Sequence, residues 1–207
     1  MPAATLLAGL FINFVAMEPL YLHMAIVGCI PPGRFTEQHD TFFGIAPSMK
    51  DLIPEIRDFW PEANGSIHID AWRRVTQVDG HAINILPADG ITMADMDSVQ
   101  KLYFLNLGGY KPGDFEEYHY KMLVAAPGPS EAIRQAKETA FYKHYGFTGA
   151  TSHIDDKYGV DVDDLHVLKD ILAPRYKHRY RVVVAAEQEP DLPEDELHIG
   201  YFKLDKL

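Results

Sequence analysis

Cysteine is nearly absent from this sequence of 207 residues. The single cysteine, Cys29, ends an apolar run, so the chain can form neither an intramolecular disulfide nor a zinc site built from several cysteines. Such a composition is typical of proteins in a reducing compartment, and it predicts a cytoplasmic location. We interpret Cys29 itself as a buried thiol rather than a nucleophile.

Basic residues are also scarce. The sequence has 19 lysines and arginines against 30 aspartates and glutamates, which gives a formal net charge of −11. This charge repels nucleic-acid backbones and anionic membrane surfaces. One basic strip does alternate with aromatic and imidazole side chains, at Arg175, Lys177, Arg179 and Arg181, and we interpret it as balancing the acidic loops. We therefore predict neither a nucleic-acid nor a membrane partner.

The motifs of several familiar reactions are missing. The sequence contains no Gly-rich phosphate loop, G-x-S-x-G elbow, C-x-x-C pair or H-E-x-x-H helix. The aspartates between residues 155 and 164 lack the glycine and glutamate that an EF-hand loop needs, in a frame starting at either Asp155 or Asp156. We interpret them as a solvated acidic loop, and we predict no bound metal and no other cofactor.

Residues 1–16 are apolar, and no charged side chain precedes Glu18. They lack the basic start and cleavage site of a signal peptide, and they are shorter than the roughly 20 residues of a membrane span. Met17 stands directly before the first predicted strand. We interpret residues 1–16 as an upstream extension, for example from a start codon assigned too early; an N-terminal anchor is the alternative.

A pattern that occurs twice organises the rest of the chain. The spacing P-G-x-F-x-E-x-H at 32–39 returns at 112–119, a shift of 80 residues. Gly28 and Gly108 keep the same shift without a gap. We therefore predict an internal duplication.

Each copy begins with a run that is apolar on both alternating faces, at Leu20 to Cys29 and at Lys101 to Gly108, which predicts strands covered on two sides. A second strand follows each run. A helix then begins at Ser48, with Asp51 at the capping-box position and Pro54 predicting a short opening turn or kink.

The second copy continues in the same order. Its helix begins at Ser130, and the sequence His-Ile-Asp, found at 68–70, recurs at 153–155 with a shift of 85 residues. An extended piece follows at Leu165 to Leu168. From Ala173 the similarity between the copies ends, and two further strands are expected to cover an open sheet edge.

These elements predict an α+β fold in which two β-β-α-β units pack about a pseudo-twofold axis. The expected segments are the extension at 1–16, the first repeat at 17–86, a linker at 87–100, the second repeat at 101–172, and C-terminal strands with an acidic loop at 173–207.

Histidines and carboxylates spaced two apart form the candidate site. Residues two apart on a strand face the same side, so each copy gathers two imidazoles and two carboxylates if its third segment packs close to its second. Such a set can satisfy itself by hydrogen bonding, bind a ligand or substrate, or bind a metal; we favour hydrogen bonding. The candidate residues are Glu37, His39, His68, Asp70, Glu117, His119, His153 and Asp155.

Several segments resemble a bacterial protein family, catalogued as domain of unknown function 1543, in two tandem copies. The similarity covers about Leu20 to Leu172, and it implies a duplicated, soluble α+β domain without implying any activity or catalytic residue. The segments that carry it are Thr36–Asp40, His68–Arg73, Lys101–Tyr110, Phe115–Lys121, Thr139–His144 and Gly149–Asp161.

Together these features predict a cytoplasmic accessory protein that binds a small molecule or a protein partner. The alternative is a hydrolase that uses the paired histidines and carboxylates, with or without a divalent metal.

Overall fold

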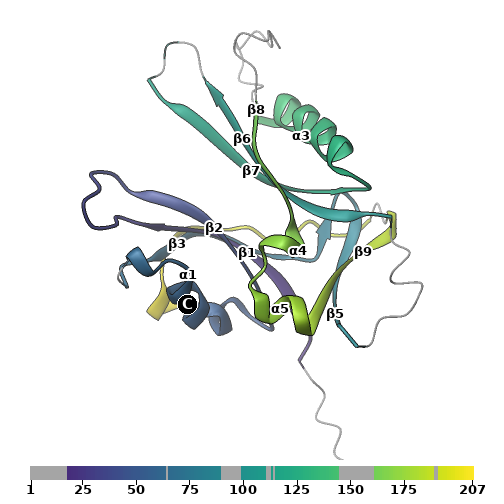
Figure 1. The fold of residues 1–207 in the computed structure, drawn as a ribbon, viewed down its shortest axis with the longest axis horizontal. Helices are drawn as coiled ribbons and strands as arrows, with labels where there is room; N and C mark the ends of the chain where they lie inside the picture. Colours follow the sequence, from purple (N-terminus) through teal and green to yellow (C-terminus); the bar gives the residue numbers. More distant parts are fainter. Residues whose placement is uncertain are drawn as a thin grey trace, which may run out of the picture.

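The computed structural model describes residues 18–63, 65–89, 99–110, 113, 115–144, 161–188 and 191–207. Its strands form antiparallel sheets that are accompanied by a few helices (Figure 1), so the predicted α+β class is confirmed. Residues 1–16, His153 and Asp155 lie outside the described part of the chain.

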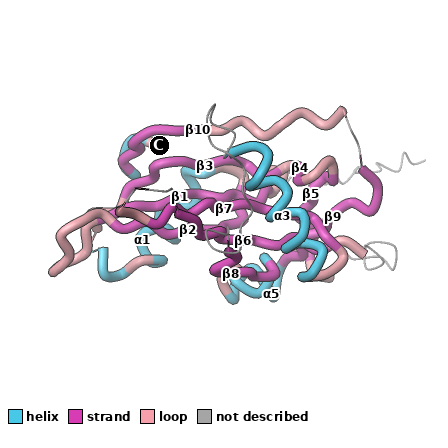
Figure 2. Tube along the Cα trace, turned by 90° about the horizontal axis from the view of Figure 1, so that it is seen from above, coloured by secondary structure: helices cyan, strands magenta, loops and turns pink. Residues whose placement is uncertain are grey.

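The first sheet has the strand order β10-β3-β1-β2. Strand β1 (Tyr21–Cys29) lies between β2 (Gln38–Ala46) and β3 (His68–Val75), and seven of its nine residues are buried, as its apolar run predicts. Strand β10 (His198–Lys203) pairs with β3 at the edge of the sheet (Figure 2). A C-terminal strand therefore covers this edge, as expected.

The helical segment between β2 and β3 begins as the sequence predicts. The Asp51 carboxylate accepts hydrogen bonds from the backbone N–H and the hydroxyl of Ser48, at 3.1 and 2.6 Å. A 3₁₀ turn, η1 (Met49–Leu52), opens the segment, and the α-helix α1 (Ile53–Phe59) follows with Pro54 in its first turn. Proline is tolerated there because its missing N–H would have no partner within the helix.

The second sheet has the order β7-β6-β8, and α3 (Pro129–His144) packs on it (Figure 1). Strand β6 (Lys101–Tyr110) is central, between β7 (Glu117–Ala126) and β8 (Asp161–Val167). All pairings within this sheet are antiparallel, as they are in the first.

The two faces of β6 join two different cores. Tyr103, Leu105 and Leu107 pack in one cluster with alanines of α3, whereas Leu102 and Phe104 belong to the larger core that contains the first sheet. The rings of Phe43 and Phe104 meet edge to face, with centroids 5.2 Å apart. Both sheets therefore contribute to the larger core, and we expect them to unfold together.

A third sheet, with the order β4-β5-β9, completes the described structure. Two short helices lead from β8 to β9, and Arg175 of the predicted basic strip lies on the second, where it forms an ion pair with Glu55 at 2.7 Å. No helix among the described residues is long and apolar enough to cross a membrane. The remaining elements are η2 (Pro61–Ala63), β4 (Gln77–Val78), β5 (His81–Pro87), α4 (Leu168–Ile171), α5 (Pro174–Arg179), β9 (Tyr180–Gln188) and η3 (Leu204–Lys206).

Strand β8 begins earlier than the sequence predicted. Strand β8 pairs with β6 from Asp161 onward, where we had predicted an acidic loop, and Leu168 already begins α4. Val162, Leu165 and Val167 of β8 pack against the core beneath α3. These three apolar side chains share one face because the bulge at Asp163 takes up the extra residue between Val162 and Leu165. The predicted acidic loop is therefore wrong for residues 161–164.

Candidate functional site

Gly28 lies at the centre of the candidate site. It stands on β1 directly between His39 of β2 and His68 of β3, because both histidines are its cross-strand partners. Their side chains therefore leave the sheet beside a residue that has no side chain. Glu37 precedes β2, Asp70 lies on β3, and we call these four polar residues, Glu37, His39, His68 and Asp70, the Gly28 cluster.

The two imidazoles and the two carboxylates of the Gly28 cluster alternate around a ring. The His39 Nε2 atom lies 3.1 Å from Asp70 Oδ2 and 3.6 Å from Glu37 Oε2. The His68 Nε2 atom lies 3.2 Å from Asp70 Oδ1 and 3.1 Å from Glu37 Oε1. Each carboxylate thus spans the two histidines, one oxygen toward each.

Proximity does not satisfy the most buried of these groups. The side chain of His68 is only 5% exposed, compared with 41% for His39 and Glu37 and 32% for Asp70. Both His68 Nε2 and Asp70 Oδ2 are buried without a hydrogen-bond partner in the described chain. The carboxylate oxygens are therefore close to His68 Nε2, but the angle is unsuitable for a hydrogen bond. A cluster built only for mutual hydrogen bonding would align these atoms.

A β-bulge directs Asp70 toward Gly28. Val27 pairs with Ile69 and Ile26 pairs with Ala71, so Asp70 has no partner on β1. Such an extra residue bends a strand and re-aims its side chain. A Cβ atom placed on Gly28 would lie 2.8 Å from both Asp70 Oδ2 and the His68 Nε2 atom. Gly28 thus leaves the space that the cluster occupies.

Strand β10 adds an aromatic ring to the site. Its pairing with β3 is also irregular opposite Asp70, between Ile199 and Phe202. Within this interval Tyr201 packs against His68, with ring centroids 4.2 Å apart and planes inclined by 30°. The contact helps to explain why His68 is buried while its Nε2 atom faces the carboxylates.

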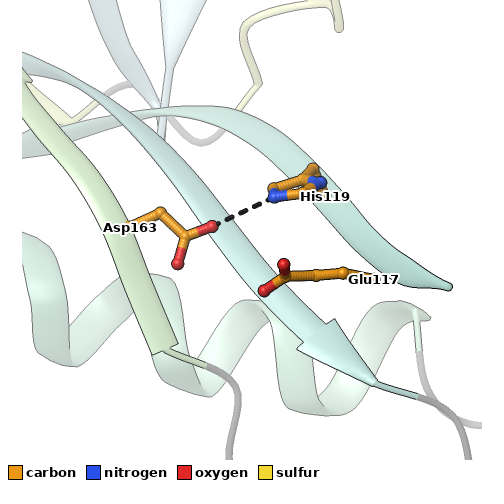
Figure 3. Close-up of side chains that lie close together, drawn as sticks. All are labelled: Glu117, His119 and Asp163. Atoms are coloured by element: carbon orange, nitrogen blue, oxygen red, sulfur yellow. Dashed lines mark ion pairs between the residues drawn. The ribbon is translucent and has the colours of Figure 1, made fainter.

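A similar but more open cluster lies over Gly108 on β6. His119 of β7 is the partner of Gly108, and Asp163 of β8 is an unpaired bulge residue, as Asp70 is on β3. His119 Nε2 and Asp163 Oδ2 are 3.3 Å apart, and Glu117 points toward both (Figure 3). These three residues, the Gly108 cluster, offer ligand atoms within 4.8 Å of one another, and all three are exposed.

The structure thus brings six of the eight predicted site residues into two clusters. The first cluster contains all four residues predicted for it, and the second contains Glu117 and His119. His153 and Asp155 lie outside the described residues, and Asp161-Val162-Asp163 occupies the position in the second sheet that His68-Ile69-Asp70 holds in the first.

Asp163 belongs to the Gly108 cluster and Tyr201 contacts the Gly28 cluster, but neither is among the predicted site residues. The run Asp161-Val162-Asp163 does carry a signal, because an aspartate follows a β-branched residue as it does in His68-Ile69-Asp70. Tyr201 carries none, because it approaches His68 only through the pairing of β10 with β3.

A surface groove lies apart from the Gly28 cluster. This groove, about 670 Å³ in volume, is lined by β3, β7 and the segment before β10, and it includes Trp72, Lys121 and His198. The Trp72 and His198 rings stack there with centroids 3.8 Å apart. None of the four cluster residues lines this groove, so the cluster is a separate surface site.

Comparison with known proteins relates this chain to a family and a fold. Residues 34–85 match the model of a family described as Domain of Unknown Function (DUF1543), and the matched range contains the whole Gly28 cluster. No protein with a curated function matches the sequence. The chain is similar in fold to the crystal structure of a protein Il1583 from Idiomarina loihiensis, with a TM-score of 0.50 and 22% identity over 89% of this chain and 97% of that one. The sequence match thus supports the predicted family over residues 34–85, and the structural match supports the overall fold.

Proposed function

We propose that this protein is a small-ligand-binding protein and that the Gly28 cluster is its binding site. The observation that carries the proposal is the pair of buried, unpartnered atoms, His68 Nε2 and Asp70 Oδ2, facing a group of four polar side chains. Leaving such atoms without partners costs about 1–3 kcal/mol each. A ligand that interacts with these atoms recovers this free energy. A cluster with a purely structural role would instead be expected to pair them within the protein.

A thermal-shift screen of the full chain against small molecules and ions tests this proposal. A ligand present at 100 times its Kd stabilises the folded state by about 2.7 kcal/mol. For a chain of this size we expect the melting temperature to rise by roughly 5–10 °C.

A glycine pair provides the matched control for the screen. Gly28→Ala places a methyl group 2.8 Å from atoms of His68 and Asp70, whereas a Cβ atom on Gly128 meets no atom of the described residues within 4 Å. Gly28→Ala should abolish the shift caused by any ligand of the site, and Gly128→Ala should preserve it. If every hit stabilises both variants equally, the ligand binds elsewhere and the proposal is refuted.

Hydrolysis at the same cluster is the second candidate function. Each imidazole lies within 3.2 Å of a carboxylate oxygen, so a small side-chain rotation would let a carboxylate hold the ring as a general base. The partly exposed His39 is accessible to a substrate. Turnover of ester or phosphoester substrates that is lost in His39→Gln would favour an enzyme over a binding protein.

We also propose that the two β-β-α-β units arose by duplication. Two shared irregularities support this: Gly28 and Gly108 each lie opposite the histidine of the second strand, and Asp70 and Asp163 are each the bulge residue of the third. Packing of the units about a pseudo-twofold axis stays a prediction.

A further inference from the structure

The donor types of the Gly28 cluster point to one class of ligand. We infer that the cluster binds a divalent first-row transition-metal cation, such as Zn²⁺ or Co²⁺, through Glu37, His39, His68 and Asp70. This inference rests on the proposed function and specifies the ligand. Imidazole and carboxylate are both ligands of such cations, and the two imidazoles disfavour Mg²⁺ and Ca²⁺, which prefer oxygen.

Charge balance supports a divalent cation. Within the described chain the ion-pair partners of Glu37 and Asp70 are the two histidines, and no lysine or arginine pairs with either carboxylate. When the imidazoles are neutral, the two carboxylates leave an uncompensated charge of −2 beside a buried ring. One divalent cation neutralises this charge, and burial strengthens the attraction.

The spacing between nitrogen and oxygen atoms of neighbouring residues is compatible with such a cation. Each Nε2 atom lies 3.1–3.6 Å from one oxygen of each carboxylate, and each carboxylate turns a different oxygen toward each histidine. Adjacent ligands of a tetrahedral zinc ion, with bonds of about 2.0–2.1 Å, are separated by about 3.3–3.4 Å. Binding of one ion therefore requires the four side chains to draw together, so that each carboxylate presents a single oxygen to the metal.

His68 is the best-prepared ligand of the four. It is almost completely buried, the Tyr201 ring packs against it, and its Nε2 atom has no hydrogen-bond partner among the described residues. Fixing an imidazole before binding lowers the entropy lost when the metal arrives. His39 and the two carboxylates are more exposed, so they leave a route by which the cation can enter.

The Gly108 cluster provides an internal comparison. It offers one imidazole and two carboxylates, and all three residues are exposed. With one fewer imidazole and without a buried donor, it should bind the same cations more weakly. We therefore assign the tight site to the Gly28 cluster. The Gly108 cluster is the alternative location, and both can be tested on the same chain.

Calorimetric titration of the full chain after treatment with a chelator tests the inference. Zn²⁺ or Co²⁺ should bind tightly with one equivalent per chain, and Mg²⁺ in excess should not compete. His68→Ala should weaken this binding at least about 100-fold, since loss of outer partners alone costs 10–100-fold. His119→Ala should leave the tight equivalent in place. Circular dichroism establishes that each variant is folded.

Gly28→Ala covers the case in which His68→Ala does not fold, because it keeps every donor and only blocks the space between them. It should lose the tight site, while Gly128→Ala retains it. Tight binding that survives in folded His68→Ala or Gly28→Ala but disappears in His119→Ala would overturn the assignment.

The test separates this inference from the proposed function. If no divalent cation binds, but a small molecule from the screen stabilises the wild type and not Gly28→Ala, the metal inference fails and the binding function stands. If Gly28→Ala changes neither the binding of any cation nor the stabilisation by any molecule, both the metal inference and the binding function fail.

Discussion

Acid should destabilise this protein through His23, a residue outside the candidate site. His23 lies on β1 with 0% of its surface exposed, and its Nε2 atom is 3.2 Å from the carbonyl oxygen of Ala46. Burial lowers the pKa of His23 from 6.5 to about 4, mainly because the charged imidazole would lose its water, and the nearby Arg74 lowers it further. The Nδ1 atom, which would take up the proton, is buried without a hydrogen-bond partner among the residues that the structure describes.

The direction of the effect follows from proton linkage. Between pH 6.5 and about 4 the unfolded chain binds a proton at this histidine and the folded chain does not, so the stability falls as the pH falls. A difference of about 2.5 pH units corresponds to about 3 kcal/mol of unfolding free energy. This contribution is fully present above pH 6.5 and is lost by about pH 4.

Urea unfolding from pH 8 to pH 4 measures this loss. His23→Gln removes the titrating group but keeps an N–H donor for Ala46, so the wild type should lose about 3 kcal/mol more than the variant over this range. As a control, His178→Gln changes an exposed histidine on α5, and this variant should lose as much unfolding free energy as the wild type over the same pH range. Identical pH dependence in the wild type and His23→Gln would refute the reasoning, as would a pKa near 6.5 for His23 in an NMR titration.

Three further predictions concern the core. Gly44→Ala places a Cβ atom 2.7 Å from a methyl carbon of the buried Leu52, and it should lower the unfolding free energy in urea by about 1–3 kcal/mol; an unchanged midpoint would contradict this. Phe104→Ala should cost about 3–5 kcal/mol, because the ring packs between the sheets; a loss below 1 kcal/mol would contradict it. Isolated halves, at 18–86 and 99–172, should be poorly folded because they divide this core, and two stable monomers with sharp transitions would contradict a shared core.

Local patterns predicted the elements that depend mainly on local physics. The double-faced apolar runs correspond to β1 and β6, which lie in the centres of their sheets. The Ser48 to Asp51 spacing predicted the helix start, and Pro54 predicted its short opening turn. In each case the residues that form the sequence pattern also make the interactions that stabilise the element.

Pairing between distant segments was harder to predict. A three-residue match led us to predict a strand at 153–155, which lies outside the described residues, whereas we had not predicted that residues 161–164 pair with β6. The contact of Tyr201 with His68 likewise depends on which sheet edge β10 joins. Both contacts depend on how distant strands pair, so the local sequence around each residue does not predict them.

The candidate site shows why spacing alone could not establish its geometry. Residues two apart on a strand are separated by about 6.6 Å, and residues on the two strands that flank a central strand by about 9.5 Å. Same-face spacing therefore leaves His39, His68 and Asp70 too far apart to interact unless their side chains lean inward over β1. They can do so only because Gly28 has no side chain and the bulge turns Asp70 inward. A glycine inside an apolar central strand, flanked in register by histidines, is thus the more informative signal, and Gly108 repeats it on one side only, with His119 opposite it on β7 and Asp161 on β8.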